Sequence, residues 1–462
     1  MANIILKDYK GNEQTYEGVE KVKLNTTDGG TQIFSKGDIA EDVQIDLDFT
    51  QGNQTINAPE GCLVKTAIIR KPNTLKPENI AKDVEIAGIV GTNEGGGGGG
   101  SSEPRMEYTY NKVGTLIAAK GIGLLSIPKY TLYQAYNLES LDLSECPNLT
   151  EIESNAFANC SSLKEVILPA SVTSFGVSAF SNCNALESIR FLGTLSEWIS
   201  LDKGSAFKNN TDRPKLYIGN SDVAVDWSTT EIPSDVTKIG NYTFAYEPIT
   251  SITIPNSVKT IGMYAFHNCS SLTSIVIPDS VTYIGTYAFD NCKSLASIEI
   301  GNSVRTIADY AFRSCPALTS IVIPDGVTSI GNNVLTSCTA LTSVTFGSGI
   351  TKMGSDILSG CSALTSITFK EGMTVIGDRM MYSGTFYNFT EVTIPASIQK
   401  IGRYAFYNAA KLDRATFVDP DGWYVSTSSS ATSGTNLTLT DPLYAASYLR
   451  MNNYRNYYWF NT

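Results

Sequence analysis

The chain has 462 residues, with 34 basic and 45 acidic side chains and a net charge of −11. This acidic balance argues against a nucleic-acid partner and against an anionic membrane surface, because both favour a basic patch. No apolar run reaches the roughly 18 residues of a membrane span, and the chain does not start with the basic and apolar regions of a signal peptide. We therefore expect no membrane insertion. If the chain is a surface protein, the missing signal peptide leaves two explanations: the chain is trimmed, or it leaves the cell in a virion.

Residues 1–93 predict a small all-β module. Short alternating apolar stretches such as Val43–Leu47 are typical of strands, and Asp28–Gly30 and Gln51–Asn53 supply turns. The stretch Lys71–Asn93 resembles a segment of tail and fibre proteins from phages of gut bacteria. That resemblance implies that residues 1–93 attach the chain to a tail or baseplate protein of a virion, with a homotrimer as one candidate assembly.

Residues 94–102 are predicted to be a flexible linker. Glu94 is followed by six glycines and two serines, a composition that favours a flexible chain. A phosphate-binding loop would need a following Lys-Ser/Thr pair, which this run lacks. Residues 103–137 are predicted to be the amino-terminal cap of the next domain, because a repeat solenoid must cover its first coil.

A 23-residue repeat dominates residues 138–417, with clear units starting at Leu272, Leu295, Leu318 and Leu341. The constant positions in the first of these units are Leu272, Ile275, Ile277, Val281, Ile284, Ala288, Phe289 and Cys292. Alternation over Ile275–Ile277 predicts a short strand that ends at Pro278. One unit cannot bury its apolar face alone, so the units are predicted to stack into a solenoid with a parallel β-sheet along one face.

The motif I-P-x-S-V-T-x-I-G-x-x-A-F-x-x-C-x-x-L-T-S-I resembles the BspA-like (type 5, 23-residue) leucine-rich repeat family over roughly Leu138–Phe417. The resemblance implies an extended adhesive solenoid without enzymatic activity, of a kind found on bacterial surfaces and in phage-encoded proteins. The period breaks near residues 191–247, where Trp198 is expected to pack inside an elongated unit. Residues 418–462 are predicted to form a carboxy-terminal cap, with an aromatic sugar-binding platform as the alternative. The residues expected to close the end of the core are Trp423, Leu443, Leu449, Trp459 and Phe460.

The residue types that catalysis needs are scarce. Cysteines such as Cys292 and Cys315 recur at 23-residue intervals, which predicts a column of buried thiols rather than disulfides or a zinc site. His267 is the only histidine, and the same slot holds Asp290 and Arg313 in the next coils, which we interpret as a solvated turn. We therefore predict no catalytic residue, no metal site and no cofactor.

Two rows of side chains are candidate ligand sites. The outward residues of the repeat strands, called here the sheet-face residues, are Ser251, Thr253, Ser274, Val276, Ser297, Glu299, Ser320, Val322, Ser343 and Thr345. The residues before the Ala-Phe pair form an aromatic column of Tyr242, Tyr264, Tyr287 and Tyr310. The alternatives are a plain solvated sheet face and tyrosines that only cover neighbouring coils.

The sequence thus favours a non-enzymatic virion protein, in a phage tail, fibre or capsid decoration, that binds a bacterial surface protein or glycan through its repeats. The alternative is a bacterial cell-surface or secreted leucine-rich repeat adhesin. An enzyme such as a depolymerase is disfavoured because the carboxylates of the repeat strands, Glu165, Glu299 and Glu391, are several coils apart.

Overall fold

A computed structural model describes residues 104–111, 114–207, 214–450 and 456–461, together with the backbone of eight strands nearer the amino terminus. These strands are β1 (Ile4–Lys7), β2 (Glu13–Tyr16), β3 (Lys21–Asn25), β4 (Thr31–Ser35), β5 (Val43–Gln44), β6 (Thr55–Asn57), β7 (Glu85–Ile86) and β8 (Ile89–Val90). Strand β1 pairs with β2 and β5, and β3 pairs with β4 and β6. The predicted linker 94–102 and most of the phage-like stretch lie outside the described residues.

The chain divides into two compact units, residues 1–193 with 205–224 and residues 194–204 with 225–462. The first unit contains a sheet in the order β17-β16-β14-β12-β10-β9-β8-β7, in which β10, β12, β14, β16 and β17 run parallel. Its strands are β9 (Arg105–Tyr110), β10 (Leu116–Ile122), β12 (Ser140–Glu145), β14 (Glu165–Leu168), β16 (Ser188–Phe191) and β17 (Lys215–Ile218). A second, parallel sheet contains β11 (Ser126–Ile127), β13 (Glu151–Ile152) and β15 (Ser174–Phe175).

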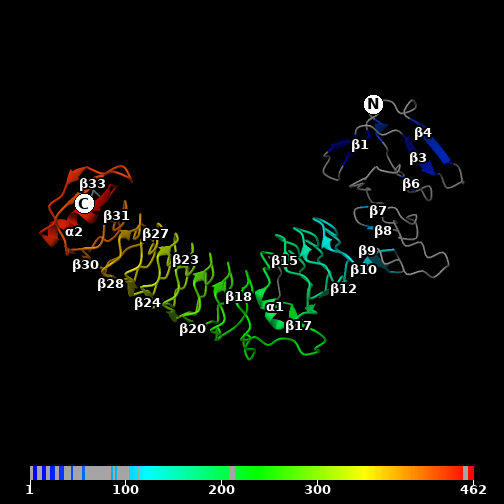
Figure 1. The fold of residues 1–462 in the computed structure, drawn as a ribbon, viewed down its shortest axis with the longest axis horizontal. Coiled ribbons are helices and arrows are strands. Elements are labelled where there is room, and N and C mark those ends of the chain that lie inside the picture. Colours follow the sequence, from blue (N-terminus) through cyan, green and yellow to red (C-terminus); the bar gives the residue numbers. More distant parts are fainter. Residues whose placement is uncertain are drawn as a thin grey trace. The chain divides into compact units, whose positions relative to one another are not determined.

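The second unit stacks its coils in the same way, and most of its coils supply one longer and one shorter strand (Figure 1). The longer strands are β20 (Ser274–Ile277), β22 (Ser297–Ile300), β24 (Ser320–Ile323), β26 (Ser343–Phe346), β28 (Ser366–Phe369), β30 (Glu391–Ile394) and β32 (Arg414–Phe417). The shorter strands are β18 (Lys238–Ile239), β19 (Thr260–Ile261), β21 (Tyr283–Ile284), β23 (Thr306–Ile307), β25 (Ser329–Ile330), β27 (Lys352–Met353), β29 (Val375–Ile376) and β31 (Lys400–Ile401). The prediction of a leucine-rich repeat solenoid with parallel sheets is confirmed.

The register of the stack follows the period of the sequence. Ser274 pairs with Ser297, and Ser320 pairs with Ser343, 23 residues further along the chain in each case. Each coil therefore places equivalent side chains directly above one another. Gly285 illustrates how close the coils come, because a Cβ atom added there would lie 2.6 Å from the carbonyl carbon of Gly262. The glycine that follows the buried isoleucine is thus required by the close approach of the backbones.

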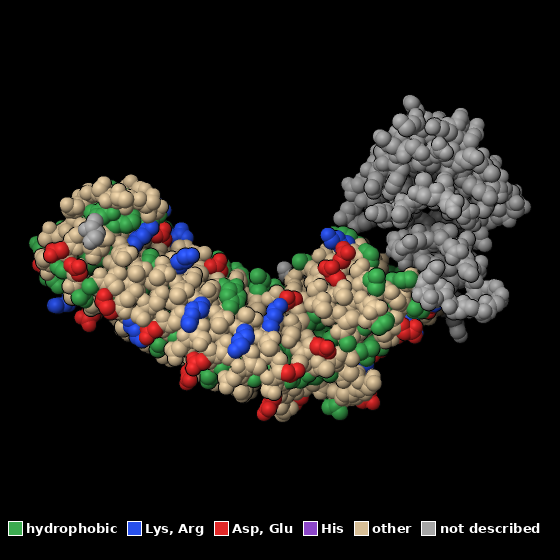
Figure 2. Space-filling model, in the orientation of Figure 1, with side chains coloured by type: hydrophobic (Ala, Val, Ile, Leu, Met, Phe, Trp, Pro, Cys, Tyr) green, Lys and Arg blue, Asp and Glu red, His purple; other side chains and the backbone are tan. Residues whose placement is uncertain are grey.

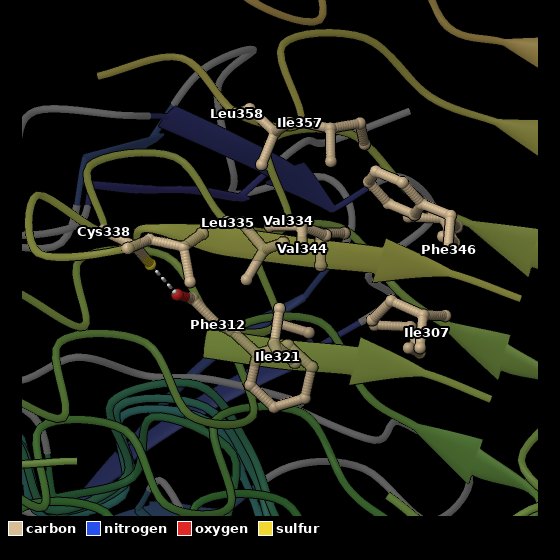
Figure 3. Close-up of a cluster of buried hydrophobic side chains, with 14 of the residues drawn as sticks. Ile307, Phe312, Ile321, Val334, Leu335, Cys338, Val344, Phe346, Ile357 and Leu358 are labelled. Carbon is tan, nitrogen blue, oxygen red and sulfur yellow. Dashed lines mark hydrogen bonds between the residues drawn. The ribbon is translucent and has the colours of Figure 1, made fainter. Parts of the chain in front are cut away.

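The core of the second unit is a column of the constant apolar residues. Phe266, Phe289 and Phe312 are fully buried, and their rings stack at centroid distances of 5.0 and 5.4 Å. Figure 3 shows the part of this core around Ile321 and Phe346. The prediction of a buried thiol column is confirmed, and Cys146 outside the column is also buried. The column consists of Cys160, Cys183, Cys269, Cys292, Cys315, Cys338 and Cys361.

The thiols also satisfy backbone carbonyls between coils. The Sγ atom of Cys338 donates a hydrogen bond to the carbonyl oxygen of Phe312 at 3.2 Å (Figure 3), and Cys315 donates to Phe289 at the same distance. Burial raises the pKa of Cys292 to about 12. These cysteines are therefore protonated packing residues rather than nucleophiles.

The second unit contains two helices that lie outside its regular repeats. Helix α1 (Leu195–Ser200) begins at a capping box formed by Thr194 and Glu197, and Trp198 is buried as predicted. Helix α2 (Pro442–Arg450) begins at Asp441, whose carboxylate accepts a hydrogen bond from the Leu443 amide at 2.9 Å.

The chain ends against the last coils of the second unit. Strands β33 (Trp423–Ser426) and β34 (Thr435–Asn436) pair with each other, and β35 (Tyr458–Asn461) pairs antiparallel with both β33 and β31. Trp423 and Trp459 are buried as expected of a cap, whereas the expectation that Leu443 is buried is wrong, because it is 60% exposed. As the second residue of α2, Leu443 points away from the face that carries Ala445, Ala446 and Leu449.

Candidate ligand-binding site

The aromatic column lies where each coil takes a left-handed backbone turn. Tyr242, Tyr264, Tyr287 and Tyr310 have φ angles of 59°, 55°, 57° and 58°. This region of backbone conformation suits glycine, asparagine and aspartate, and it is unfavourable for a bulky side chain. Asn333 and Asp356 occupy the same slot in the following coils, with φ of 56° and 59°. The turn is therefore a property of the fold, and tyrosine is one of several residues that the slot accepts.

The four rings form a continuous stack, called here the tyrosine ladder. The centroid distances are 4.6 Å from Tyr242 to Tyr264, 4.6 Å from Tyr264 to Tyr287 and 4.5 Å from Tyr287 to Tyr310. All four side chains are partly exposed. Burial, and then the neighbouring Tyr264, raise the pKa of Tyr242 to about 12. The ladder presents ring edges and hydroxyl groups in register.

A charged cluster lies beside the ladder. Asp290 is buried, with 1% of its side chain exposed, and Arg313 donates two hydrogen bonds to its carboxylate at 2.8 and 3.0 Å. His267 Nδ1 lies 3.0 Å from Asp290 Oδ2, the oxygen that also accepts the hydrogen bond from Arg313 Nη2. The guanidinium of Arg313 also covers Tyr287 and Tyr310, at 5.0 and 5.2 Å from the ring centroids.

The interpretation of the His267 slot as a solvated turn is wrong, because Asp290 in that slot is buried. Burial raises the pKa of Asp290, but the contacts with His267 and Arg313 outweigh burial and hold this pKa below its usual range. The spacing carries a signal that could have predicted the cluster, since His267, Asp290 and Arg313 follow one another at 23-residue intervals. Asp356 and Arg379 repeat the pattern and form an ion pair at 2.5 Å.

The sheet-face residues lie in a different part of each coil from the ladder. Ser274 and Val276 on β20, and the equivalent residues on β22 and β24, are exposed, whereas Ser343 and Thr345 on β26 are partly buried. The expectation of a strand at Ser251–Thr253 is wrong, because these exposed residues have no strand pairing in the described part of the chain. The site assignments for both rows stay predictions.

Among the described residues, no group of three or more His, Cys, Asp or Glu side chains is arranged to hold a metal ion. Glu299 on β22 and Glu391 on β30 have β24, β26 and β28 between them. The described residues also contain no helix of the length and apolarity that would span a membrane.

The repeats define the family of the chain. The model of the BspA type leucine rich repeat region matches residues 119–221, 225–341 and 305–421, in six copies. This match covers well over half of the chain, so the chain belongs to the BspA-type leucine-rich repeat family. It is a leucine-rich repeat protein of the bacterial surface-protein type. The match begins at residue 119, and the likeness of residues 71–93 to phage tail proteins stays a prediction.

Several solved structures are similar to this chain. A leucine-rich repeat protein from Bacteroides ovatus ATCC 8483 is 23% identical, with a TM-score of 0.44 over 68% of this chain and 89% of that chain. A leucine rich cell surface protein from Faecalibacterium prausnitzii A2-165 is 26% identical, with a TM-score of 0.36 over 70% of this chain and 96% of that chain. The pneumococcal vaccine antigen PcpA is 19% identical, with a TM-score of 0.43 over 68% and 77% of the two chains. No curated protein sequence matches the chain.

Proposed function

We propose that this chain is a non-enzymatic adhesin of a bacterial surface that recognises its ligand through the tyrosine ladder. Membership of the BspA-type family supports the surface location. The observation that carries the proposal is that four successive coils hold tyrosine in a left-handed backbone turn. Strained residues that persist in a structure cluster at functional sites, so the inference runs from the observed conformation to a role in binding.

The energetics argue that folding alone does not select these tyrosines. A left-handed conformation costs a non-glycine residue about 1–2 kcal/mol, or about 4–8 kcal/mol for the four tyrosines of the ladder. Three stacked pairs return about 0.5–1.5 kcal/mol each beyond their burial, about 1.5–4.5 kcal/mol in total, so over most of this range stacking offsets only part of the strain. Asn333 fills the same turn without a ring, and asparagine is better suited to this backbone. The exposed ring edges are therefore the property that tyrosine adds.

The repeat gives the mode of binding. Equivalent groups recur at about 4.8 Å along the stack, the spacing of parallel strands. A ligand that itself repeats, such as a surface glycan, or a protein that lies along the coils can contact several rings at once. Each contact is weak alone, and several contacts together supply avidity.

Cell binding by the full-length chain tests the proposal. In the variant Tyr264→Asn/Tyr287→Asn, each slot receives asparagine, which occupies the same slot of a later coil as Asn333. The matched control, Tyr387→Asn/Tyr444→Asn, removes two tyrosines that are 64% and 66% exposed away from the ladder. Flow cytometry of labelled protein on bacterial and epithelial cells should show about a tenfold loss for the ladder variant only, for a loss near 1.4 kcal/mol. Equal binding by the ladder variant and the original chain would rule out the ladder as the ligand site.

A second location is favoured by one specific observation, the likeness of Lys71–Asn93 to phage tail and fibre segments. In this alternative, residues 1–93 dock on a virion tail or baseplate protein, and residues 94–102 form a flexible linker to the solenoid. The solenoid, with its caps at 103–137 and 418–462, contacts the bacterial host. Immunogold electron microscopy with antibodies to the chain separates the two locations. Label on the cell envelope supports the surface adhesin, and label on tails of phage particles supports the virion protein and reports its symmetry.

A further inference from the structure

Basic side chains recur along the shorter strands of the second unit, although the chain as a whole is acidic. The eight four-residue segments that end in these strands are 236–239, 258–261, 281–284, 304–307, 327–330, 350–353, 373–376 and 398–401. They contain the basic residues Lys238, Lys259, Arg305, Lys352 and Lys400 and no acidic residue. The eight equivalent segments of the longer strands, from 251–254 to 414–417, contain Glu299, Glu391 and Arg414. The two sides of one coil therefore differ in charge, in a protein with a net charge of −11.

Four of these cations form what we call the basic strip: Lys259, Arg305, Lys352 and Lys400. Lys259 and Arg305 directly precede β19 and β23, and Lys352 and Lys400 lie in β27 and β31. Successive members are two coils apart, because β21, β25 and β29 come between them. Lys259 and Arg305 share one position of the coil, and Lys352 and Lys400 lie one position further along it. At about 4.8 Å per strand the cations recur about every 10 Å along the stack. Lys and Arg side chains follow one another along the visible face of these coils in Figure 2.

Carboxylates do not neutralise the strip within the described residues. Lys259 and Lys352 have no side-chain partner there. Arg305 donates to the backbone carbonyls of Asn302 and Gly326, each at 3.1 Å. Lys400 donates to the carbonyl of Ser429 at 2.8 Å and lies over the Tyr458 ring at 4.8 Å. Lys238 is excluded from the strip because it pairs with Asp202 at 2.7 Å.

The nearest acidic side chains along the sequence on the ladder side of the strip are already engaged. The carboxylate of Asp309 accepts a hydrogen bond from the Asn332 amide at 2.7 Å. The carboxylate of Asp356, four residues after Lys352, is paired with Arg379. Tyr283, which is 40% exposed on β21, lies between the coils of Lys259 and Arg305 and offers a ring to a sugar.

We infer that the basic strip binds a linear acidic polysaccharide whose carboxylate or sulfate groups recur once in every few sugars. The inference rests on the proposed adhesin function and adds a second binding surface to the tyrosine ladder. Cations that recur about every 10 Å along the stack suit a polymer of sparse, regular charge. Nucleic acid carries a charge about every 1.7 Å of duplex, and anionic membranes attract clusters of adjacent cations, so both fit the strip less well.

The test uses the full-length chain with hyaluronan, which bears a carboxylate on every second sugar, neutral dextran and single-stranded DNA as probes. The strip variant is Lys259→Gln/Arg305→Gln/Lys352→Gln. The control, Lys293→Gln/Lys411→Gln/Arg414→Gln, removes the same charge from exposed residues outside the strip. Circular dichroism checks that both variants are folded. Biolayer interferometry should show binding to hyaluronan that weakens with salt, with an affinity about tenfold lower in the strip variant and nearly unchanged in the control.

Three results would overturn the inference: no binding to hyaluronan, equal losses in the two variants, or equal affinity for hyaluronan and DNA. Cell binding separates this failure from a failure of the proposed function. A chain that binds cells equally with and without the strip, and does not bind hyaluronan, is an adhesin with another ligand. If the chain binds hyaluronan through the strip but binds no cells, the inference about the strip holds and the proposed adhesin function is wrong.

Discussion

Two groups of coils in the second unit share one backbone turn and fill it differently. The coils of Tyr264, Tyr287 and Tyr310 carry stacked rings, and the next coils carry Asn333, Asp356 and Arg379 in the same slot with φ between 50° and 59°. The core changes at the same place, since Ala288-Phe289 becomes Val334-Leu335. The backbone is therefore set by the stack, while the side chains of each coil remain free to specialise. Exchanging residues between the two groups tests this comparison.

The largest effect is expected in the core. Phe289→Ala should lower the free energy of unfolding by about 3–5 kcal/mol, because it leaves a cavity between the rings of Phe266 and Phe312. Phe289→Leu, which copies Leu335 of the later coils, should cost under about 1.5 kcal/mol if the stack repacks. Urea unfolding followed by circular dichroism measures both. Similar losses for the two variants would mean that the coils are not interchangeable.

The next effect concerns the charged cluster. Asp290→Asn should destabilise the chain by about 1–3 kcal/mol at pH 7, because Arg313 and His267 lose a buried anionic partner. Asp356→Asn in the later coils should cost less, since Asp356 is more exposed at 12% and contacts only one cation, Arg379.

The effect of Asp290 should also depend on pH. The pKa of Asp290 is lowered in the folded chain, so its stabilising effect is complete above the unfolded pKa of about 4 and is lost as pH falls through the folded pKa. Urea unfolding at several pH values should therefore show the difference between Asp290→Asn and the original chain shrinking below about pH 4. A difference that grows on acidification would contradict the assigned ion pairs.

A smaller effect is expected in the ladder. Tyr287→Asn should change the free energy of unfolding by less than about 1 kcal/mol, because relief of backbone strain offsets the lost stacking. Asn333→Tyr should be similarly mild, since Tyr310 precedes it in the stack, and it should extend the ladder by one ring. If the ladder binds the ligand, Asn333→Tyr strengthens cell binding a few-fold. Strong destabilisation by Tyr287→Asn would make the ladder a structural feature instead.

The cysteine thiols should be equally unreactive in the two groups of coils. Cys292 and Cys338 are both fully buried and both donate to a backbone carbonyl of the preceding coil. Native-state labelling with a thiol reagent, read by mass spectrometry, should leave both unmodified until the chain unfolds. Rapid labelling of one of them would reveal local opening of its coil.

The sequence alone predicted the elements that depend on the period. Leu272, Ile275 and Phe289 recur at fixed intervals, and an apolar residue that recurs in every coil must face the one core that all coils share. The solenoid and the thiol column follow from this reasoning, whereas the burial of Trp198 was implied by the family resemblance of its elongated unit. The aromatic column was also visible in the spacing, but its stacking distance and its left-handed backbone were not.

Only the tertiary structure shows which contacts each variable side chain makes with the coils above and below it. Asp290 was predicted to be solvated because its slot tolerates many residues, yet its neighbours at 23-residue spacing bury it and pair with it. Leu443 was predicted to be buried from its type, yet its helix turns it outward. The basic strip emerged only when the short strands were seen to stack into one face. A period determines which residues are equivalent, whereas burial, pairing and charge depend on the contacts between successive coils.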